Sequence, residues 1–150
     1  MTEVTERVVP HSLAAEQAIL GAILLHQEVY HAAAQVVVEN DFFRDAHRRV
    51  FHQMGALIDR GVAIDLITLT EALAQAGDLD TCGGPAYLTS LVDGLPRSTN
   101  IAHYATIVRQ KAQLRSTIHV ATRILTAAYE EAEPGSVLDD GVRQLLSIAG

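Results

Sequence analysis

Residues Ile64 to Arg115 read IDLITLTEALAQAGDLDTCGGPAYLTSLVDGLPRSTNIAHYATIVRQKAQLR, a stretch with three helix starts and two glycine turns. Thr68 followed three residues later by Glu71 has the spacing of a capping box, in which a hydroxyl and a carboxylate satisfy backbone donors at a helix start. A helix is therefore predicted from about Leu69. Gly77 ends this helix, because glycine adopts the left-handed conformation without a clash at Cβ.

The same stretch predicts two further helices. Gly84 supplies a free turn residue and Pro85 a proline at the first helical position, where the missing N–H costs nothing, so a short helix is expected over Ala86 to Val92. Pro96 disfavours helix at the residue before it. A much longer helix follows, capped by one of three polar residues, Ser98, Thr99 or Asn100.

Upstream, apolar residues at three-and-four spacing predict three more helices. They cover Ser12 to His26, about Glu28 to Glu39, and Asp45, acting as the cap, through Arg60. Ser12 is expected to be a cap and not a nucleophile, because sequence neighbours at a helix start cannot orient a base against its hydroxyl. Gly21 costs its helix about 1 kcal/mol against alanine, so the close approach of a neighbouring helix is the expected compensation.

Downstream of Asn100, the apolar spacing continues for about eight turns, which is unusually long for a small domain. Residues 130–135 break it, and Ser136 with Asp139 has a capping-box-like spacing that begins a last helix, so the two helices should form a hairpin. Apolar residues of the hairpin are too many for one seam between two helices: Ile118, Ile124, Leu125, Leu145 and Ile148. Partner helices, as in a four-helix arrangement made by a dimer, are therefore expected. The alternative is that the hairpin folds back onto the chain's own globular part.

The sequence as a whole predicts an all-α fold, a compact helical globule followed by a C-terminal helical hairpin. The expected divisions are a flexible arm over residues 1–11, a globular subdomain over 12–98 and the hairpin over 99–150. Of the 150 residues, 49% are hydrophobic and none is tryptophan, so alanine, leucine, isoleucine and valine must build the core. Alanine favours helices over strands.

The charge argues against a primary nucleic-acid-binding surface. The 18 acidic and 11 basic residues give a net charge of −7, and Lys111 is the single lysine, whereas phosphate affinity depends on clustered lysine and arginine. One basic cluster is recognised, and it fits a solvated helix face with local ion pairs better than a partner-binding patch: Arg44, Arg48 and Arg49 near Arg60. No apolar run approaches the roughly 20 residues of a membrane span and no signal peptide is recognised, so a cytoplasmic location is expected.

The sequence lacks the common catalytic and cofactor motifs. No glycine is followed by lysine, so a Walker A phosphate loop cannot be written, and G-x-G-x-x-G does not occur. The histidine pairs His26/His31 and His47/His52 are five residues apart, which rotates the two rings off a shared helix face. Surface or helix-end histidines are therefore expected, with no metal site and no cofactor.

Three other groups have structural explanations. Cys82 is the single cysteine, which excludes an internal disulfide, and it is predicted to be a small turn residue. Asp139 and Asp140 are assigned to the first turn of the last helix, where the helix dipole favours carboxylates. Glu130, Glu131 and Glu133 fit a solvated hairpin tip.

One series of residues, taken in order and spacing, resembles the N-terminal domain of the DnaB family of bacterial replicative DNA helicases, and the likeness covers nearly all of the chain. The matching residues are Pro10-His11-Ser12, Glu16-Gln17, Leu20-Gly21, Asp41-Phe42, His47-Arg48, Phe51, Ile64-Asp65-Leu66-Ile67-Thr68-Leu69, Gly83-Gly84, Ala86-Tyr87-Leu88, Asn100, Tyr104-Ala105, Ile107-Val108, Lys111-Ala112 and Leu114-Arg115.

This resemblance implies a non-catalytic collar domain whose copies meet in pairs through their hairpins, as a dimer or as a hexamer made of three dimers. It also implies docking of primase and of a helicase loader during DNA replication. The family's ATP and Mg²⁺ sites and its DNA translocation belong to a RecA-like motor domain, which is expected beyond Gly150 and is absent from this chain.

The sequence leaves two other functions open. One is a free-standing adaptor that binds a helicase, a loader or a primase with the same fold, and the other is a small helical enzyme. Under the collar interpretation, the candidate residues for self-association or partner contacts are Arg109, Lys111, Arg115, Ile118, Leu125, Val142, Leu145 and Leu146.

Overall fold

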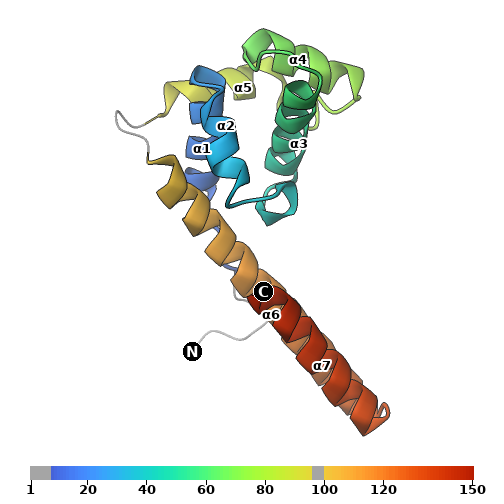
Figure 1. Cartoon of the computed structure of the whole chain (residues 1–150). Helices are drawn as coiled ribbons and strands as arrows, with labels where there is room; N and C mark the ends of the chain where they lie inside the picture. The colour runs from blue at the N-terminus through green and yellow to red at the C-terminus, as the bar shows by residue number, and fades with distance from the viewer. Residues whose placement is uncertain (1–7, 96–99) are drawn as a thin grey trace. The chain divides into compact units, whose positions relative to one another are not determined.

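A computed structural model of the chain describes residues 8–95 and 100–150, and every regular element within these ranges is a helix (Figure 1). The elements, in order, are α1 (Leu13–Leu25), α2 (Val29–Ala34), the 3₁₀ helix η2 (Glu39–Asp41), α3 (Asp45–Asp59), α4 (Leu66–Gln75), α5 (Gly84–Asp93), α6 (Ile101–Tyr129) and α7 (Pro134–Ala149). The predicted all-α fold with a C-terminal helical hairpin is confirmed. None of the described helices is long and apolar enough to cross a membrane.

The chain forms two compact units, here called the globular unit, residues 11–109, and the hairpin unit, residues 110–150 with 1–10. Helix α6 begins in the globular unit and ends in the hairpin unit. The expected flexibility of the N-terminal arm and the expected boundary near residue 98 stay predictions. Three residues discussed above, Pro96, Ser98 and Thr99, lie outside the described residues.

Helix α1 is the centre of the globular unit, because it is buried around most of its circumference and packs against α2, α3 and α5. Gly21 faces α5 so closely that an added Cβ would lie 2.1 Å from the carbonyl oxygen of Leu91. The predicted close approach at this glycine is therefore confirmed. Buried side chains of other elements complete the core: Phe42, Val50, Met54, Leu57, Leu69, Leu73 and Leu88.

Several predicted helix ends are confirmed by their caps. The hydroxyl of Ser12 accepts a hydrogen bond from the backbone N–H of Ala15. Gly77, with φ of +77°, follows the end of α4. Of the three candidates for the start of α6, Asn100 is the described one, and its side-chain oxygen accepts from the N–H of His103 at 3.2 Å.

Helix α4 begins three residues earlier than predicted, at Leu66. Asp65 is the cap, since its carboxylate accepts from the N–H of Thr68 at 2.8 Å while the Thr68 hydroxyl accepts from the N–H of Asp65 at 2.9 Å. Thr68 is thus the third residue of the helix and not its cap. Aspartate is a stronger cap than threonine, which explains the choice.

The second predicted helix was wrong in length, because α2 ends at Ala34 and not near Glu39. Valines follow it, and Val38 is fully extended with φ of −116° and ψ of 168°. The Asp41 carboxylate accepts from the N–H of Val38 at 2.9 Å and so starts η2 instead. Stiff β-branched side chains and a competing side-chain acceptor both act against helix here.

Three other helix starts differ from the predictions. Helix α5 begins at Gly84, so Pro85 is its second residue and not its first. Asp45 is the first residue of α3 and not its cap, and it pairs with Arg48 and Arg49. Helix α7 begins at Pro134, with the Glu133 carboxylate accepting from two backbone N–H groups, whereas Ser136 was the predicted cap.

Because α7 starts earlier, Asp139 and Asp140 lie beyond its first turn, and the dipole explanation for them was wrong. Asp140 instead forms an exposed ion pair with Arg143 at 3.1 Å.

Candidate interaction surfaces

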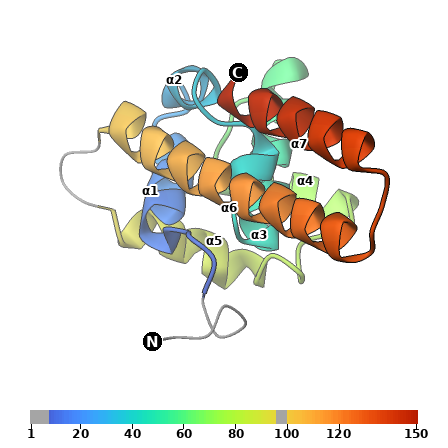
Figure 2. The same cartoon turned by 90° about the horizontal axis from the view of Figure 1, so that it is seen from below.

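The hairpin unit is built from the C-terminal part of α6 and from α7, which run antiparallel and side by side (Figures 1 and 2). The seam between the two helices includes Gly141, where an added Cβ would come within 2.9 Å of the Cδ1 atom of Ile124. Val120 is buried in the same unit. Small and β-branched residues therefore set how closely the two helices approach.

Large apolar side chains remain exposed on both helices of the hairpin. Each of them has at least 42% of its surface exposed. These residues, here called the apolar face, are Leu114, Ile118, Leu125 and Tyr129 of α6 and Leu138, Val142, Leu145 and Leu146 of α7.

Helix geometry places the α6 residues and the α7 residues of the apolar face on the same side of the hairpin. Leu125 follows Ile124 of the seam, and Val142 follows Gly141, so each lies about 100° further around its own helix. Because the helices are antiparallel, this rotation carries both residues toward the same side. The three-and-four spacing of the other members keeps them near these two positions.

The other side of the hairpin holds a pocket of about 580 Å³, here called the basic pocket. It is lined by Arg115, Ser116, His119, Val120, Arg123, Arg143, Gln144, Ser147 and Ile148. Three arginines of the hairpin unit therefore line one pocket. The sequence analysis recognised only the basic cluster around α3, so its prediction of a single basic cluster was wrong.

Two arginines of the recognised cluster, Arg48 and Arg49 of α3, form the local ion pairs that were expected. Arg49 contacts Asp45 at 2.7 Å and Asp78 at 2.5 Å, and the hydrogen-bonded Arg49 guanidinium holds the pKa of the Asp45 carboxyl below its usual range. Arg48 donates to the carbonyls of Phe42 and Phe43. These arginines stabilise local structure.

The eight predicted interaction residues fall into different places. Ile118, Leu125, Val142, Leu145 and Leu146 all belong to the apolar face. Lys111 precedes Ile118 by seven residues and so lies on the same side of α6. Arg115 instead lines the basic pocket, where its Nη1 donates to the carbonyl of Pro10 at 2.8 Å. Arg109 is half-buried and belongs to the globular unit.

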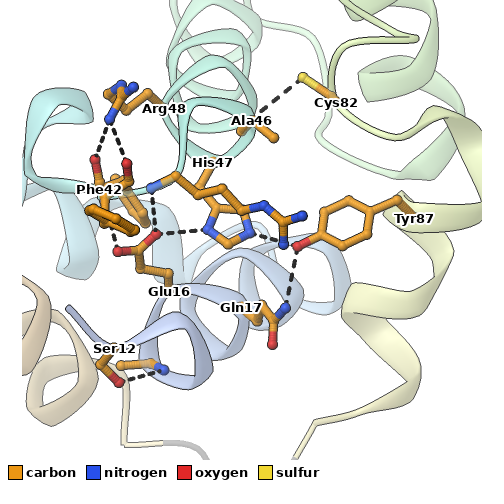
Figure 3. A network of polar contacts seen from close by, with 12 residues as sticks. Ser12, Glu16, Gln17, Phe42, Ala46, His47, Arg48, Cys82 and Tyr87 are labelled. Atoms are coloured by element: carbon orange, nitrogen blue, oxygen red, sulfur yellow. Dashed lines mark hydrogen bonds and ion pairs between the residues drawn. The ribbon is translucent and has the colours of Figure 1, made fainter. Parts of the chain in front are cut away.

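A buried polar network in the globular unit was not predicted (Figure 3). The Glu16 carboxylate lies 2.7 Å from Nδ1 of His47 and accepts from the backbone N–H of Phe43 at 2.8 Å. His47 Nε2 lies 2.7 Å from the hydroxyl of Tyr87, which accepts from Nε2 of Gln17 at 3.3 Å. The network joins α1, α3, α5 and the segment before α3.

One arrangement of donors and acceptors satisfies every member of this network. When Nδ1–H of His47 donates to Glu16, Nε2 can accept the hydroxyl proton of Tyr87, while Tyr87 accepts from Gln17. The expectation that all histidines are surface or helix-end residues was wrong for His47, which is fully buried. The sequence did contain a signal for this network, because its four polar side chains are all among the residues that carry the family resemblance: Glu16, Gln17, His47 and Tyr87.

The remaining candidates for chemistry have structural roles. Cys82 is a buried turn residue whose thiol donates to the carbonyl of Ala46, and burial raises its pKa, which keeps the thiol protonated. Within residues 8–95 and 100–150, no three His, Cys, Asp or Glu side chains are grouped to hold a metal ion.

Known proteins resemble the chain over most of its length. Residues 8–110 match the family described as the DnaB-like helicase N terminal domain. The chain is 38% identical to the replicative DNA helicase DnaB of Geobacillus stearothermophilus over 97% of its own length and 32% of that protein. It is 39% identical to the replicative DNA helicase DnaC of Bacillus subtilis over 96% of its length and 30% of that protein. The chain thus spans about a third of these relatives.

Solved structures show the same fold. The N-terminal domain of DnaB helicase from Mycobacterium tuberculosis matches with a TM-score of 0.87 and 32% identity, over 93% of this chain and 99% of that one. A DnaB-like replicative helicase, studied with its interactions with primase, matches with a TM-score of 0.73 and 24% identity, over 91% of this chain and 31% of that one. The second likeness bears on the fold alone.

Proposed function

The chain belongs to the family of DnaB-like helicase N-terminal domains, and we propose that it acts as a non-catalytic collar that assembles helicase subunits and docks replication partners. Its own role is to hold copies and partners in place. ATP hydrolysis, Mg²⁺ binding and DNA translocation are proposed for the two thirds of the relatives' length that this chain does not span.

The observation that carries the assembly proposal is the apolar face of the hairpin. Eight large apolar side chains exposed on a unit of two helices form a surface of the kind that marks a protein interface. A second copy of the same hairpin, related by a twofold axis, would bury this face in a four-helix arrangement. Pairs joined in this way are the proposed building blocks of a hexameric ring.

Docking of primase and of a loader is the second part of the proposal. Its support is the family membership; a solved structure with the same fold, that of a DnaB-like replicative helicase, was studied with its interactions with primase. Arg109, Lys111 and Arg115 are the proposed contact residues for such partners. Co-purification of the chain with the primase of the same genome, and loss of that association on replacing these three residues by alanine, tests this part.

Light scattering tests the assembly proposal. We expect the wild-type chain to form a dimer or a larger even-numbered oligomer, and Leu145→Glu combined with Leu146→Glu to give a monomer, because four charges cannot be buried between two hairpins. The control combines Val38→Glu with Ile67→Glu, which adds the same charge at exposed apolar positions of the globular unit. An oligomer that survives the first pair, or dissociates with the control pair, places the interface elsewhere.

A further inference from the structure

The charges of the hairpin unit are separated along its length. All five acidic residues of 110–150 lie between positions 130 and 140, at and just after the turn: Glu130, Glu131, Glu133, Asp139 and Asp140. Arginines dominate the remainder of the hairpin. The unit therefore has an acidic end and a basic pocket, although the chain as a whole carries a charge of −7.

Among the described residues that line the basic pocket there is no carboxylate, and the lining includes three guanidinium groups and the imidazole of His119. Arg143 contacts Asp140 outside the pocket at 3.1 Å, but both side chains are mostly exposed, and such a pair contributes little. Arg123 makes no hydrogen bond or ion pair with the part of the chain that the structure describes.

The rest of the lining adds neutral donors and an apolar floor. Ser116, Gln144 and Ser147 offer hydroxyl and amide groups, and Val120 and Ile148 offer aliphatic surface. Guanidinium groups bind carboxylates in a planar, two-pronged geometry that lysine cannot reproduce. The pocket thus combines anion recognition with room for one or two apolar side chains.

We infer that the basic pocket binds an acidic peptide segment of a partner protein, with its carboxylates on Arg123 and Arg143 and an apolar side chain on Val120 and Ile148. A nucleic acid fits less well, because no phenylalanine, tyrosine or tryptophan lines the pocket for base stacking and the net charge of the chain repels a polyanion. The inference rests on the proposed function only in that the chain is taken to dock partners.

Fluorescence anisotropy with a defined probe tests this inference on the full chain. The probe is a labelled 12-residue peptide with four glutamates around two leucines, and its matched control carries glutamine in place of each glutamate. We expect the glutamine peptide to bind about tenfold more weakly or worse, because it loses the charge-assisted hydrogen bonds to two guanidinium groups. Binding of the acidic peptide should also weaken as salt increases.

Substitutions of the pocket arginines test whether the acidic peptide binds in the basic pocket. Arg123→Glu and Arg143→Glu should each weaken acidic-peptide binding by about tenfold, and Arg123→Lys should have an intermediate effect because it keeps charge but loses the planar fork. Arg60→Glu is the matched control, since it makes the same charge change at an exposed position of the globular unit and should leave binding unchanged. Circular dichroism of each variant checks that the helices are intact, and Arg123→Gln replaces any variant that fails to fold.

Three outcomes would overturn the inference. Equal binding of the acidic and glutamine peptides would remove the carboxylate requirement. Preferential binding of a 12-nucleotide single-stranded DNA would make the occupant a nucleic acid. Loss of self-association with Arg123→Glu would make the occupant the acidic end of a second copy. Peptide binding by the Leu145→Glu, Leu146→Glu variant separates this result from the assembly proposal, because that variant leaves the pocket lining unchanged.

Discussion

At the scale of single residues, Glu16 holds the globular unit together from its centre. Its side chain is 1% exposed and accepts from His47 and from the backbone N–H of Phe43, so it links α1 to α3 and to the segment that leads into α3. A buried carboxylate is costly unless donors surround it, and here those donors are present. The contacts fix the orientation of the His47 ring, and through it Tyr87 of α5.

Removing the Glu16 carboxylate should therefore destabilise the globular unit strongly. We expect Glu16→Ala to lower the free energy of unfolding by about 3 kcal/mol or more, because the buried His47 ring and the partly buried N–H of Phe43 lose their acceptor. Glu16→Gln should cost less, since its amide oxygen can still accept one bond. Urea denaturation followed by circular dichroism measures both.

Glu71→Ala is the control for the Glu16 variants. Glu71 is exposed on α4 and its carboxylate accepts only from Gln75 among the described contacts, so its loss should change the free energy of unfolding by less than about 0.5 kcal/mol. Similar effects of Glu16→Ala and Glu71→Ala would mean that the buried network contributes nothing net to stability.

At the scale of elements, local sequence predicted which segments are helical better than it predicted their ends. The number of long helices and the hairpin follow from apolar spacing, which depends on neighbouring residues only. The end of α2 and the starts of α4 and α7 depend on which of several nearby polar side chains reaches a free backbone N–H, as Asp41, Asp65 and Glu133 do. Several candidates lie within three residues of the starts of α4 and α7, so spacing alone does not decide among them.

The interaction surfaces show more clearly that local sequence does not predict contacts between residues that are far apart in the chain. The apolar residues of the hairpin were predicted because they exceed what one seam can bury. The basic pocket was missed because Arg123 and Arg143 are 20 positions apart and meet only after the turn brings α7 against α6. The network around Glu16 was missed for a similar reason, since its hydrogen-bonded partners are 27 to 70 positions apart in sequence.

The packing of α1 against α5 leads to a prediction at the same scale. Gly21→Ala should destabilise the globular unit by at least about 2 kcal/mol, because the new methyl group would meet the backbone of Leu91, which cannot move alone. In Gly55→Ala, the matched control in the middle of α3, the added methyl meets the hydroxyl end of Tyr30 at 2.6 Å. That end can move, and alanine favours helix, so the net change should stay within about 1 kcal/mol.

Thermal unfolding followed by circular dichroism compares the stabilities of the Gly21→Ala and Gly55→Ala variants. The packing argument fails if Gly21→Ala is as stable as Gly55→Ala, because α5 would then be free to move away from α1 without a cost.

At the scale of the whole molecule, the two units differ in how they bury their apolar surface. The globular unit encloses a core of fully buried side chains, whereas the hairpin unit leaves the apolar face in solvent. A two-helix unit with one seam has little buried surface of its own. Its stability should therefore depend on a second copy, while the stability of the globular unit should not.

Hydrogen exchange at two protein concentrations tests this difference. We expect the amide protection of α7 residues to increase about tenfold over a hundredfold rise in concentration within the dissociation range, since dimer formation stabilises the folded hairpin by mass action. Protection in α1 should stay constant. In the Leu145→Glu, Leu146→Glu variant, the protection of α7 should become independent of concentration. Protection that is high and constant in wild-type α7 would mean that one hairpin is stable without a partner, and the apolar face would then need a different occupant.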